Sequence, residues 1–168
     1  ADARIRSDAP AHRLDVGGRR VSKQRCAALD QVDDHYIDHP PHYFVHQAPA
    51  TEQTEVWIFY DDDMIYVAAR CYDSSPEEKW VANEMRRDSN GVVRNENLAI
   101  YFDTFYDRRN AFLFEISPIG GIYDAYVTNE RGPGNVDYNP VWDRQAGRFE
   151  KGWTAEMAIP FRSLRYKP

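Results

Sequence analysis

Two neighbouring runs of alternating hydrophobic residues constrain this chain more than any other feature. Apolar residues occupy every second position over residues 98–103 and again over 112–117. A period of two is typical of half-buried antiparallel strands, and the polar stretch 104–110 between them is suited to a hairpin loop. A proline and two glycines then end the second run and lead to a third expected strand over 122–127. We expect the rest of the chain to pack on the face that these three apolar rows form.

The remaining strands follow the same pattern. We expect them over residues 54–60, 64–73, 84–88, 141–146 and 153–159. Short helical turns are expected over 76–81 and 161–166, and loops over 89–94 and 129–140. Seven or more short strands with little helix predict an all-β fold, an antiparallel β-sandwich with one or two short helices.

The length of 168 residues predicts one domain that is large enough to bury a core. Hydrophobic residues make up 42% of the chain and charged residues 29%, which is typical of a globular protein. The first residues are polar, basic and weakly periodic. We therefore expect an N-terminal arm over 1–28 and a β-sandwich domain over 29–168.

The charge balance and the missing motifs exclude several functions. A net charge of −6 argues against a nucleic-acid partner, because binding to phosphates needs clustered cations. The chain has neither a Gly-x-Ser-x-Gly nor a His-Glu-x-x-His motif, and we expect no catalysis by this domain. Cys26 and Cys71 leave two alternatives open: a disulfide in an exported protein, or a Cys71 side chain that is a small buried hydrophobe.

The order of the motifs resembles a known family. The matching stretches are TEVWIFYDDDMIYVAARCYDSSP (54–76), RRD (86–88), ENLAIYFDTFYDRRNAFLFEISPIGGIYDA (96–125) and VWDRQAGRFEKGWTAEMAIPFRSLRY (141–166). They are similar to the family 9 carbohydrate-binding-module-like domain at the N-terminus of bacterial proteins of unknown function, which continue into an outer-membrane barrel. The chain departs from the family around Leu29 and Asp30, in the expected first strand, which lacks the usual Gly and Trp, and in having Glu96 where the family usually has Asp.

The resemblance implies a non-catalytic, carbohydrate-binding-like sandwich module of an exported, cell-envelope protein that is periplasmic or associated with the outer membrane. It also implies that the chain continues past Pro168, since the family runs on into at least one more strand. The implied partners are a carbohydrate ligand and a C-terminal outer-membrane barrel of the same or a partner chain, with no nucleic acid.

Sugar recognition needs aromatic rings that stack on the apolar face of a pyranose, and charged or amide groups that pair with its hydroxyls. Tyr138 is a possible stacking residue, and the residues that we expect to bind carbohydrate are Trp142, Trp80, Arg87, Glu96, Tyr126 and Asn129. Two of these have an alternative role: Trp80 as a residue packed between a helix and the sheet, and Trp142 as a core residue.

Two further expectations concern metals and partners. Related sandwiches often carry structural calcium, and the resemblance implies ligands at Asp88, Asp103 and Asp124, which lie near strand ends. The alternative function is an interaction or plug domain that docks on an outer-membrane β-barrel without binding sugar. That alternative predicts contact surfaces of exposed aromatic residues, such as Tyr101 and Tyr106.

Overall fold

The structure, a computed structural model, describes residues 52–129 and 134–166 and the backbone of four short strands before them. These four strands are β1 (Ile5–Arg6), β2 (Asp15–Val16), β3 (Arg19–Arg20) and β4 (Cys26–Leu29). β4 crosses the expected boundary between arm and domain and pairs with the sandwich. The division of the chain at residue 28 stays a prediction.

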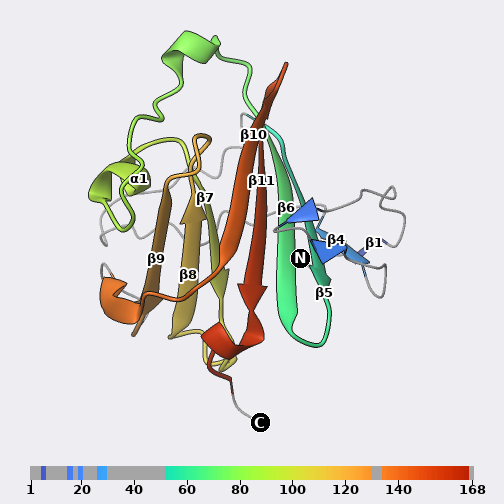
Figure 1. The fold of residues 1–168 in the computed structure, drawn as a ribbon, viewed down its shortest axis with the longest axis vertical. Coiled ribbons are helices and arrows are strands. Elements are labelled where there is room, and N and C mark those ends of the chain that lie inside the picture. The colour runs from blue at the N-terminus through green and yellow to red at the C-terminus, as the bar shows by residue number, and fades with distance from the viewer. Residues whose placement is uncertain are drawn as a thin grey trace, which may run out of the picture.

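The strands form two main antiparallel sheets, which stand side by side in Figure 1. The six-stranded sheet has the order β1-β4-β5-β6-β11-β10. Its longer strands are β5 (Thr54–Tyr60), β6 (Met64–Tyr72), β10 (Asp143–Phe149) and β11 (Gly152–Pro160). The three-stranded sheet joins β7 (Leu98–Phe102), β8 (Ala111–Ile116) and β9 (Ile122–Val127). β2 and β3 pair only with each other.

The two sheets share one hydrophobic core, which confirms the expected β-sandwich. Phe112, Phe114 and Ile116 of β8 alternate toward this core, and Val67 of β6 and Met157 of β11 meet them from the other sheet. The larger sheet is apolar on both faces, as the strand over 54–60 predicts. Its opposite face buries a second cluster of Phe59, Met64, Tyr66 and Ala158.

The segment before β7 differs from the prediction. Residues 84–88 form no strand: 84 and 85 have no regular structure, and the chain turns over 86–88, where Asp88 has a positive φ of 57° and donates its backbone N–H to Ile122 O. The expected loop over 89–94 contains helix α1 (Asn90–Arg94), and the Ser89 side chain caps its N-terminus. Val92 of α1 is fully buried among Leu113, Tyr123, Ala125 and Val127, on the outer face of the three-stranded sheet.

Three short 3₁₀ helices complete the described part of the chain. η1 (Glu77–Lys79) and η3 (Phe161–Ser163) lie in the two stretches where short helical turns are expected. η2 (Val136–Tyr138) lies within the expected loop over 129–140 and is capped by the Asn135 side chain. In the part of the chain that the structure describes, no helix is long and apolar enough to span a membrane.

Cys71 is a free, half-buried thiol. Cys26 lies opposite Phe59 on β5, and Cys71 lies opposite Thr54 on the same strand. These two partners are five residues apart along β5, which is roughly 17 Å and far beyond the reach of a disulfide. Burial, with a smaller contribution from Glu96, raises the pKa of the Cys71 thiol to about 12. The thiol therefore stays protonated and packs as a small hydrophobic side chain.

Candidate functional site

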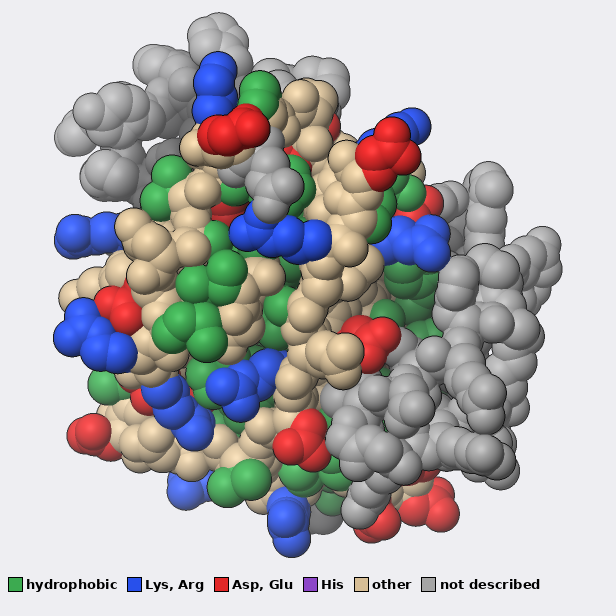
Figure 2. All heavy atoms as spheres, turned by 45° about the horizontal axis from the view of Figure 1, so that its top comes forward, with side chains coloured by type: hydrophobic (Ala, Val, Ile, Leu, Met, Phe, Trp, Pro, Cys, Tyr) green, Lys and Arg blue, Asp and Glu red, His purple; other side chains and the backbone are tan. Residues whose placement is uncertain are grey.

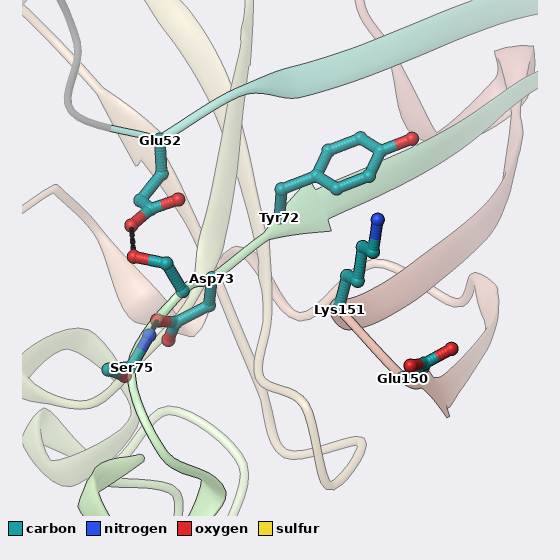
Figure 3. A pocket seen from close by; sticks show the side chains of 7 residues that line it. Glu52, Tyr72, Asp73, Ser75, Glu150 and Lys151 are labelled. Atoms are coloured by element: carbon teal, nitrogen blue, oxygen red, sulfur yellow. Dashed lines mark hydrogen bonds between the residues drawn. The ribbon is translucent and has the colours of Figure 1, made fainter.

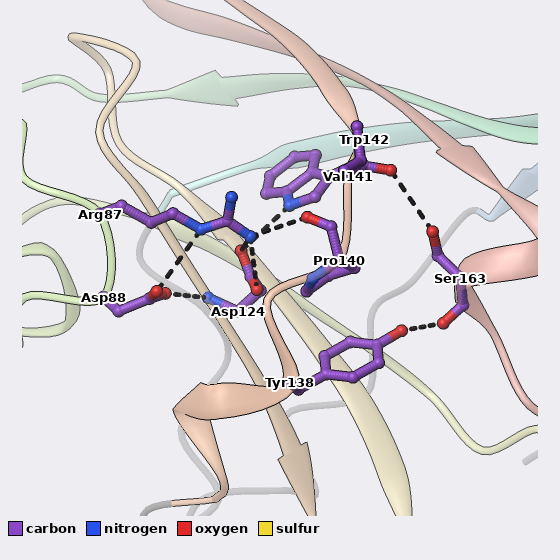
Figure 4. Close-up of polar contacts among 8 residues, drawn as sticks. All are labelled: Arg87, Asp88, Asp124, Tyr138, Pro140, Val141, Trp142 and Ser163. Carbon is purple, nitrogen blue, oxygen red and sulfur yellow. Dashed lines mark hydrogen bonds and ion pairs between the residues drawn. The ribbon is translucent and has the colours of Figure 1, made fainter.

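A polar network forms around Asp124, whose side chain projects from β9 into the sandwich (Figure 4). Arg87 Nη2 donates to Asp124 Oδ1 at 2.9 Å, to Asp124 Oδ2 at 2.7 Å and to Pro140 O at 2.8 Å. Trp142 Nε1 donates to Asp124 Oδ2 at 3.1 Å. Asp124 is fully buried, whereas 37% of the Arg87 side chain is exposed.

Asp88 holds the same network from the other side. Its Oδ1 accepts a hydrogen bond from the backbone N–H of Asp124 at 3.1 Å, and its Oδ2 lies 3.4 Å from Arg87 Nε. The network therefore ties the 86–88 turn, β9 and the segment at Pro140 together. Burial raises the pKa of Asp124 although the hydrogen bonds from Arg87 and Trp142 lower it, so desolvation of this carboxylate outweighs its favourable partners.

Trp142 is part of the core and not of an exposed stacking surface. Only 5% of the residue is exposed, and its ring meets Phe114 edge to face at a centroid distance of 5.3 Å. A pyranose cannot lie against a ring that is enclosed in this way. Of the two roles open to Trp142, the structure supports packing.

The three acids expected to bind calcium do not converge. Asp88 and Asp124 are engaged with Arg87. The Asp103 carboxylate accepts the backbone N–H groups of Asp107 and Arg108 within its own loop. Asp124 is in register with Phe114 and, through it, with Ile100. Asp103 therefore lies two strands away and three residues further along, roughly 14 Å from Asp124.

Calcium prefers six to eight oxygen ligands from one cage, which these three acids do not provide. Across the described residues, no group of three or more His, Cys, Asp or Glu side chains is placed to hold a metal ion. Asp88, Asp103 and Asp124 therefore do not fit the calcium site that the resemblance implies.

A small hollow, here called the tyrosine pocket, lies where β9 ends. It has a volume of about 230 Å³ and is lined by Phe112, Tyr126, Asn135, Asp137, Tyr138 and Arg165. The Phe112 ring lies 4.9 Å from the Tyr126 ring and 5.0 Å from the Tyr138 ring between centroids. Both tyrosines are half-buried, and the three polar residues are exposed.

Backbone and side-chain hydrogen bonds hold the tyrosine pocket in shape. Tyr126 and Asn135 exchange two backbone hydrogen bonds of 3.1 and 2.8 Å, which fix η2 against the end of β9. The Tyr138 hydroxyl donates to the backbone oxygen of Ser163. Burial, assisted by Asp124, raises the pKa of Tyr138 to about 12, and Arg165 opposes this rise. Tyr138 therefore stays a neutral donor at physiological pH.

Trp80 lies near the other end of the molecule. It is half-buried and packs against the main core, its indole N–H donates to Ser75 O at 3.2 Å, and the Arg148 guanidinium lies 5.3 Å from the centre of its ring. The packing role that was open to Trp80 is therefore seen in the structure. Glu96 lies near Asp73: desolvation of the Glu96 carboxyl and the charge of Asp73 both raise its pKa.

Ser75 and Asp73 also line a wider hollow, here called the end cleft (Figure 3). Its volume is about 400 Å³, and its lining residues are Glu52, Tyr72, Asp73, Ser74, Ser75, Glu150 and Lys151. Asp73 Oδ1 accepts the backbone N–H of Ser75 at 2.7 Å, and Ser74 Oγ donates to Glu52. Trp80 and Glu96 border this cleft through Ser75 and Asp73 but do not line it.

The residues expected to bind carbohydrate thus fall into separate places. Trp142 and Arg87 belong to the buried network, Trp80 and Glu96 border the end cleft, and Tyr126 lines the tyrosine pocket. Asn129 is exposed just after β9, with a φ of 57°. The sequence-based expectation omitted the polar residues of the tyrosine pocket: Asn135, Asp137 and Arg165. The turn-rich stretch 129–140 was the signal for the first two, while nothing in the sequence pointed to Arg165.

Comparisons with known proteins give few matches. No family model matches the chain, and no curated protein matches it. The chain is similar to a solved carbohydrate binding module family 9 from Caldicellulosiruptor kristjanssonii in complex with cellotriose, with a TM-score of 0.46 and 16% identity over 73% of this chain and 54% of that chain. It is also similar to one in complex with glucose, with a TM-score of 0.47 and 17% identity over 73% of this chain and 55% of the other.

The chain therefore spans about half the length of these solved structures. The sandwich itself is established by the strand pairing and the shared core of this chain.

Proposed function

We propose that this chain is a non-catalytic carbohydrate-binding module and that the tyrosine pocket is its sugar site. One observation carries the proposal. Two half-buried tyrosines flank Phe112, and an amide, a carboxylate and a guanidinium from Asn135, Asp137 and Arg165 surround them in one hollow. Rings supply the stacking surface that the apolar face of a sugar needs, and the three polar groups supply donors and acceptors for its hydroxyls.

The pocket is formed before any ligand binds, which favours recognition. The paired backbones of Tyr126 and Asn135 and the Tyr138 hydroxyl bond fix the two rings. A sugar then meets ordered groups, so less conformational entropy is lost on binding.

The same lining argues for binding rather than hydrolysis. Glycosidases act with two carboxyl groups on either side of the scissile bond. Among the residues that line the tyrosine pocket, Asp137 is the only carboxylate. The enclosed Asp124 belongs to the Arg87 network and has no exposed surface. The pocket therefore has the chemistry of a lectin-like site.

Replacing Tyr126 with alanine tests the proposal. We expect Tyr126→Ala to weaken sugar binding at least about tenfold, because the variant loses the apolar area buried under the sugar and, in addition, an aromatic contact of about 0.5–1.5 kcal/mol. Tyr126→Phe should bind nearly as well, since it keeps the ring. The measurement is a glycan array followed by titration calorimetry, with glucose and cellotriose, the sugars of the two similar solved structures, among the probes.

Met85→Ala serves as the control, because Met85 is 58% exposed and does not line the tyrosine pocket. Circular dichroism of each variant confirms that it is folded. Sugar binding that survives Tyr126→Ala unchanged would place the site elsewhere, with the end cleft as the next region to test.

A second proposal is that the module belongs to an exported cell-envelope protein and docks on an outer-membrane barrel of the same or a partner chain. Tyr106, at 86% exposed, and Tyr101, at 43%, support it as aromatic contact residues. Figure 2 shows hydrophobic side chains in the middle of one face, with basic and acidic side chains around them.

The docking proposal is tested by capture of the barrel region from outer-membrane extracts. We expect Tyr106→Ala to reduce this capture at least about fivefold and to leave sugar binding unchanged, because such an exposed ring contributes to a contact surface and not to the tyrosine pocket. Equal capture by the variant and the original chain would contradict the docking role of this residue.

A further inference from the structure

A second hollow lies at the same end of the sandwich as the tyrosine pocket. It has a volume of about 420 Å³ and is lined by Asp62, Asp63, Met64, Pro160, Phe161, Arg162 and Tyr166. In Figure 1, η2, η3 and the turn between β5 and β6 all lie at the lower end of the molecule. We call this space the turn hollow, since two of its acids come from that turn.

We propose that the tyrosine pocket and the turn hollow are two subsites for one extended, uncharged oligosaccharide, so that the module binds within a sugar chain rather than a single sugar. This inference rests on the proposed function and deepens it by naming the ligand class. Three observations carry it: the wall that the hollows share, their matching chemistry and their mixed charge.

The wall between the hollows is the segment that begins with η3. The backbone N–H of Phe161 donates to Asp63 O at 2.8 Å on the side of the turn hollow. The Tyr138 hydroxyl donates to Ser163 O on the side of the tyrosine pocket, and Thr104 Oγ1 donates to Arg165 O. Leu164 is buried in the core. One anchored segment therefore sets the position of both hollows.

The hollows are close together along this segment. Arg162 lines the turn hollow and Arg165 lines the tyrosine pocket. They are three positions apart in the chain, so their Cα atoms lie at most about 11 Å apart. A ligand of a few linked rings can span such a distance, while a single sugar can occupy only one of the hollows.

The turn hollow repeats the chemistry of the tyrosine pocket. Tyr166 is 60% exposed and adds a ring beside the apolar side chains of Met64 and Phe161. Among the described residues, the carboxylates of Asp62 and Asp63 make no hydrogen bond or ion pair, in contrast to Asp61, whose carboxylate accepts three hydrogen bonds. Both hollows offer an aromatic ring and exposed polar side chains, which suits a ligand with a repeating unit.

The charges of the hollows favour a neutral chain. The tyrosine pocket has one acid and one arginine, Asp137 and Arg165. The turn hollow has Asp62 and Asp63 with Arg162. Each hollow therefore mixes both signs, which serves donors and acceptors of hydroxyl groups and selects no strongly charged peptide or anion.

The experiment measures affinity against chain length. The complete chain is titrated with β-1,4-linked glucose oligomers of one, three and six units, and is screened on an array of xylose, mannose and N-acetylglucosamine chains in several lengths. We expect the longest bound oligomer to bind at least about tenfold more tightly than the single sugar. Tyr166→Ala should remove this gain and leave single-sugar binding unchanged, whereas Tyr126→Ala should weaken every length.

The outcomes separate this inference from the proposed function. Equal affinity for the single sugar and the longest chain, with no effect of Tyr166→Ala, overturns the two-subsite inference and leaves the sugar pocket in place. A folded chain that binds no oligomer of any length overturns both. Binding to a peptide array that Tyr166→Ala abolishes, without glycan binding, also overturns both. Met85→Ala again serves as the control and should change none of these values.

Discussion

Arg87→Ala is expected to lower the free energy of unfolding by about 3 kcal/mol. Breaking a buried ion pair by removing one partner costs about 3–5 kcal/mol, because the remaining charge stays buried without compensation. Asp124 has no exposed surface, and Arg87 is its only cationic partner among the described residues. We place the value at the lower end of the range, since 37% of the Arg87 side chain is exposed to solvent.

The neighbouring arginine is a matched control. Arg86 pairs with Glu84 at 2.8 Å, but 83% of its side chain is exposed. Surface pairs of this kind contribute little to stability, because solvent screens them, so Arg86→Ala should change stability far less than Arg87→Ala does. The measurement is urea unfolding of both variants, followed by circular dichroism and by tryptophan fluorescence. Equal effects of the two substitutions would show that the Arg87 network does not stabilise the fold.

The Arg87 prediction has a pH dependence with a definite sign. Burial already raises the pKa of Asp124, and loss of Arg87 removes interactions that lower it, so the pKa should rise further. An acid with a raised pKa in the folded state destabilises the fold progressively as pH rises from its unfolded pKa to its folded pKa, and the loss is complete above the folded pKa. The deficit of Arg87→Ala should therefore be larger at pH 8 than at pH 5.

The Arg87 network also shows why the sequence predicted Arg87 and Trp142 as sugar-binding residues, while the structure places both around the buried Asp124. An arginine and a tryptophan near strand ends are suited to sugar binding, and nothing local in the sequence distinguishes that role from a clamp. The distinction comes from Asp124, whose position on β9 in register with Phe114 points its carboxylate into the sandwich. Trp142 then satisfies its indole N–H inside the core, where no ligand can reach its ring.

The strands themselves were predictable because their pattern is local. Alternation over β7 and β8 marks the face that carries Phe112 and Phe114, and the structure buries both. The helix α1 was missed because glycine and two valines have low helix propensity. The Ser89 cap and the complete burial of Val92 offset that cost, and tertiary packing of this kind is not visible in a short stretch of sequence.

The tyrosine pocket was only half predictable for a related reason. Tyr126 stands on a recognisable strand, and the stretch 129–140 has the composition of a binding loop. Arg165 joins them only because Tyr138 contacts Ser163, a residue 25 positions further along the chain. Such a contact depends on how η3 folds back over the end of the sandwich, and no periodic pattern in the sequence predicts it.

Glu115 is expected to give the fold a second pH dependence, centred below neutrality. It is buried on the outer face of β8, where only 4% of the residue is exposed, and its Oε2 atom has no hydrogen-bond partner among the residues that the structure describes. Burial raises the pKa of this carboxyl to about 7 from its ordinary value of 4.5. The folded state therefore holds a proton that the unfolded chain releases near pH 4.5.

The sign and size of this effect follow from linkage. Below pH 4.5 both states are protonated, and Glu115 costs nothing. As pH rises toward 7 the unfolded chain ionises first, so the free energy of unfolding falls, and above pH 7 the loss is complete. A difference between 4.5 and 7 corresponds to a loss of about 3 kcal/mol. Nearby Tyr123, whose own pKa is raised by burial and by Glu115, supplies no positive charge to offset it.

Glu115→Gln removes the titrating group and keeps its shape. We expect this variant to unfold at a higher urea concentration than the original chain at pH 8, by up to about 3 kcal/mol, and to match it within about 1 kcal/mol at pH 4.5. Glu84→Gln serves as a control in which the pKa shift has the opposite sign, because hydrogen bonds from Arg86 lower the pKa of Glu84 to about 2. An unchanged difference across this pH range would mean that Glu115 finds a partner when it ionises, and that the β8 face opens to admit water or a cation.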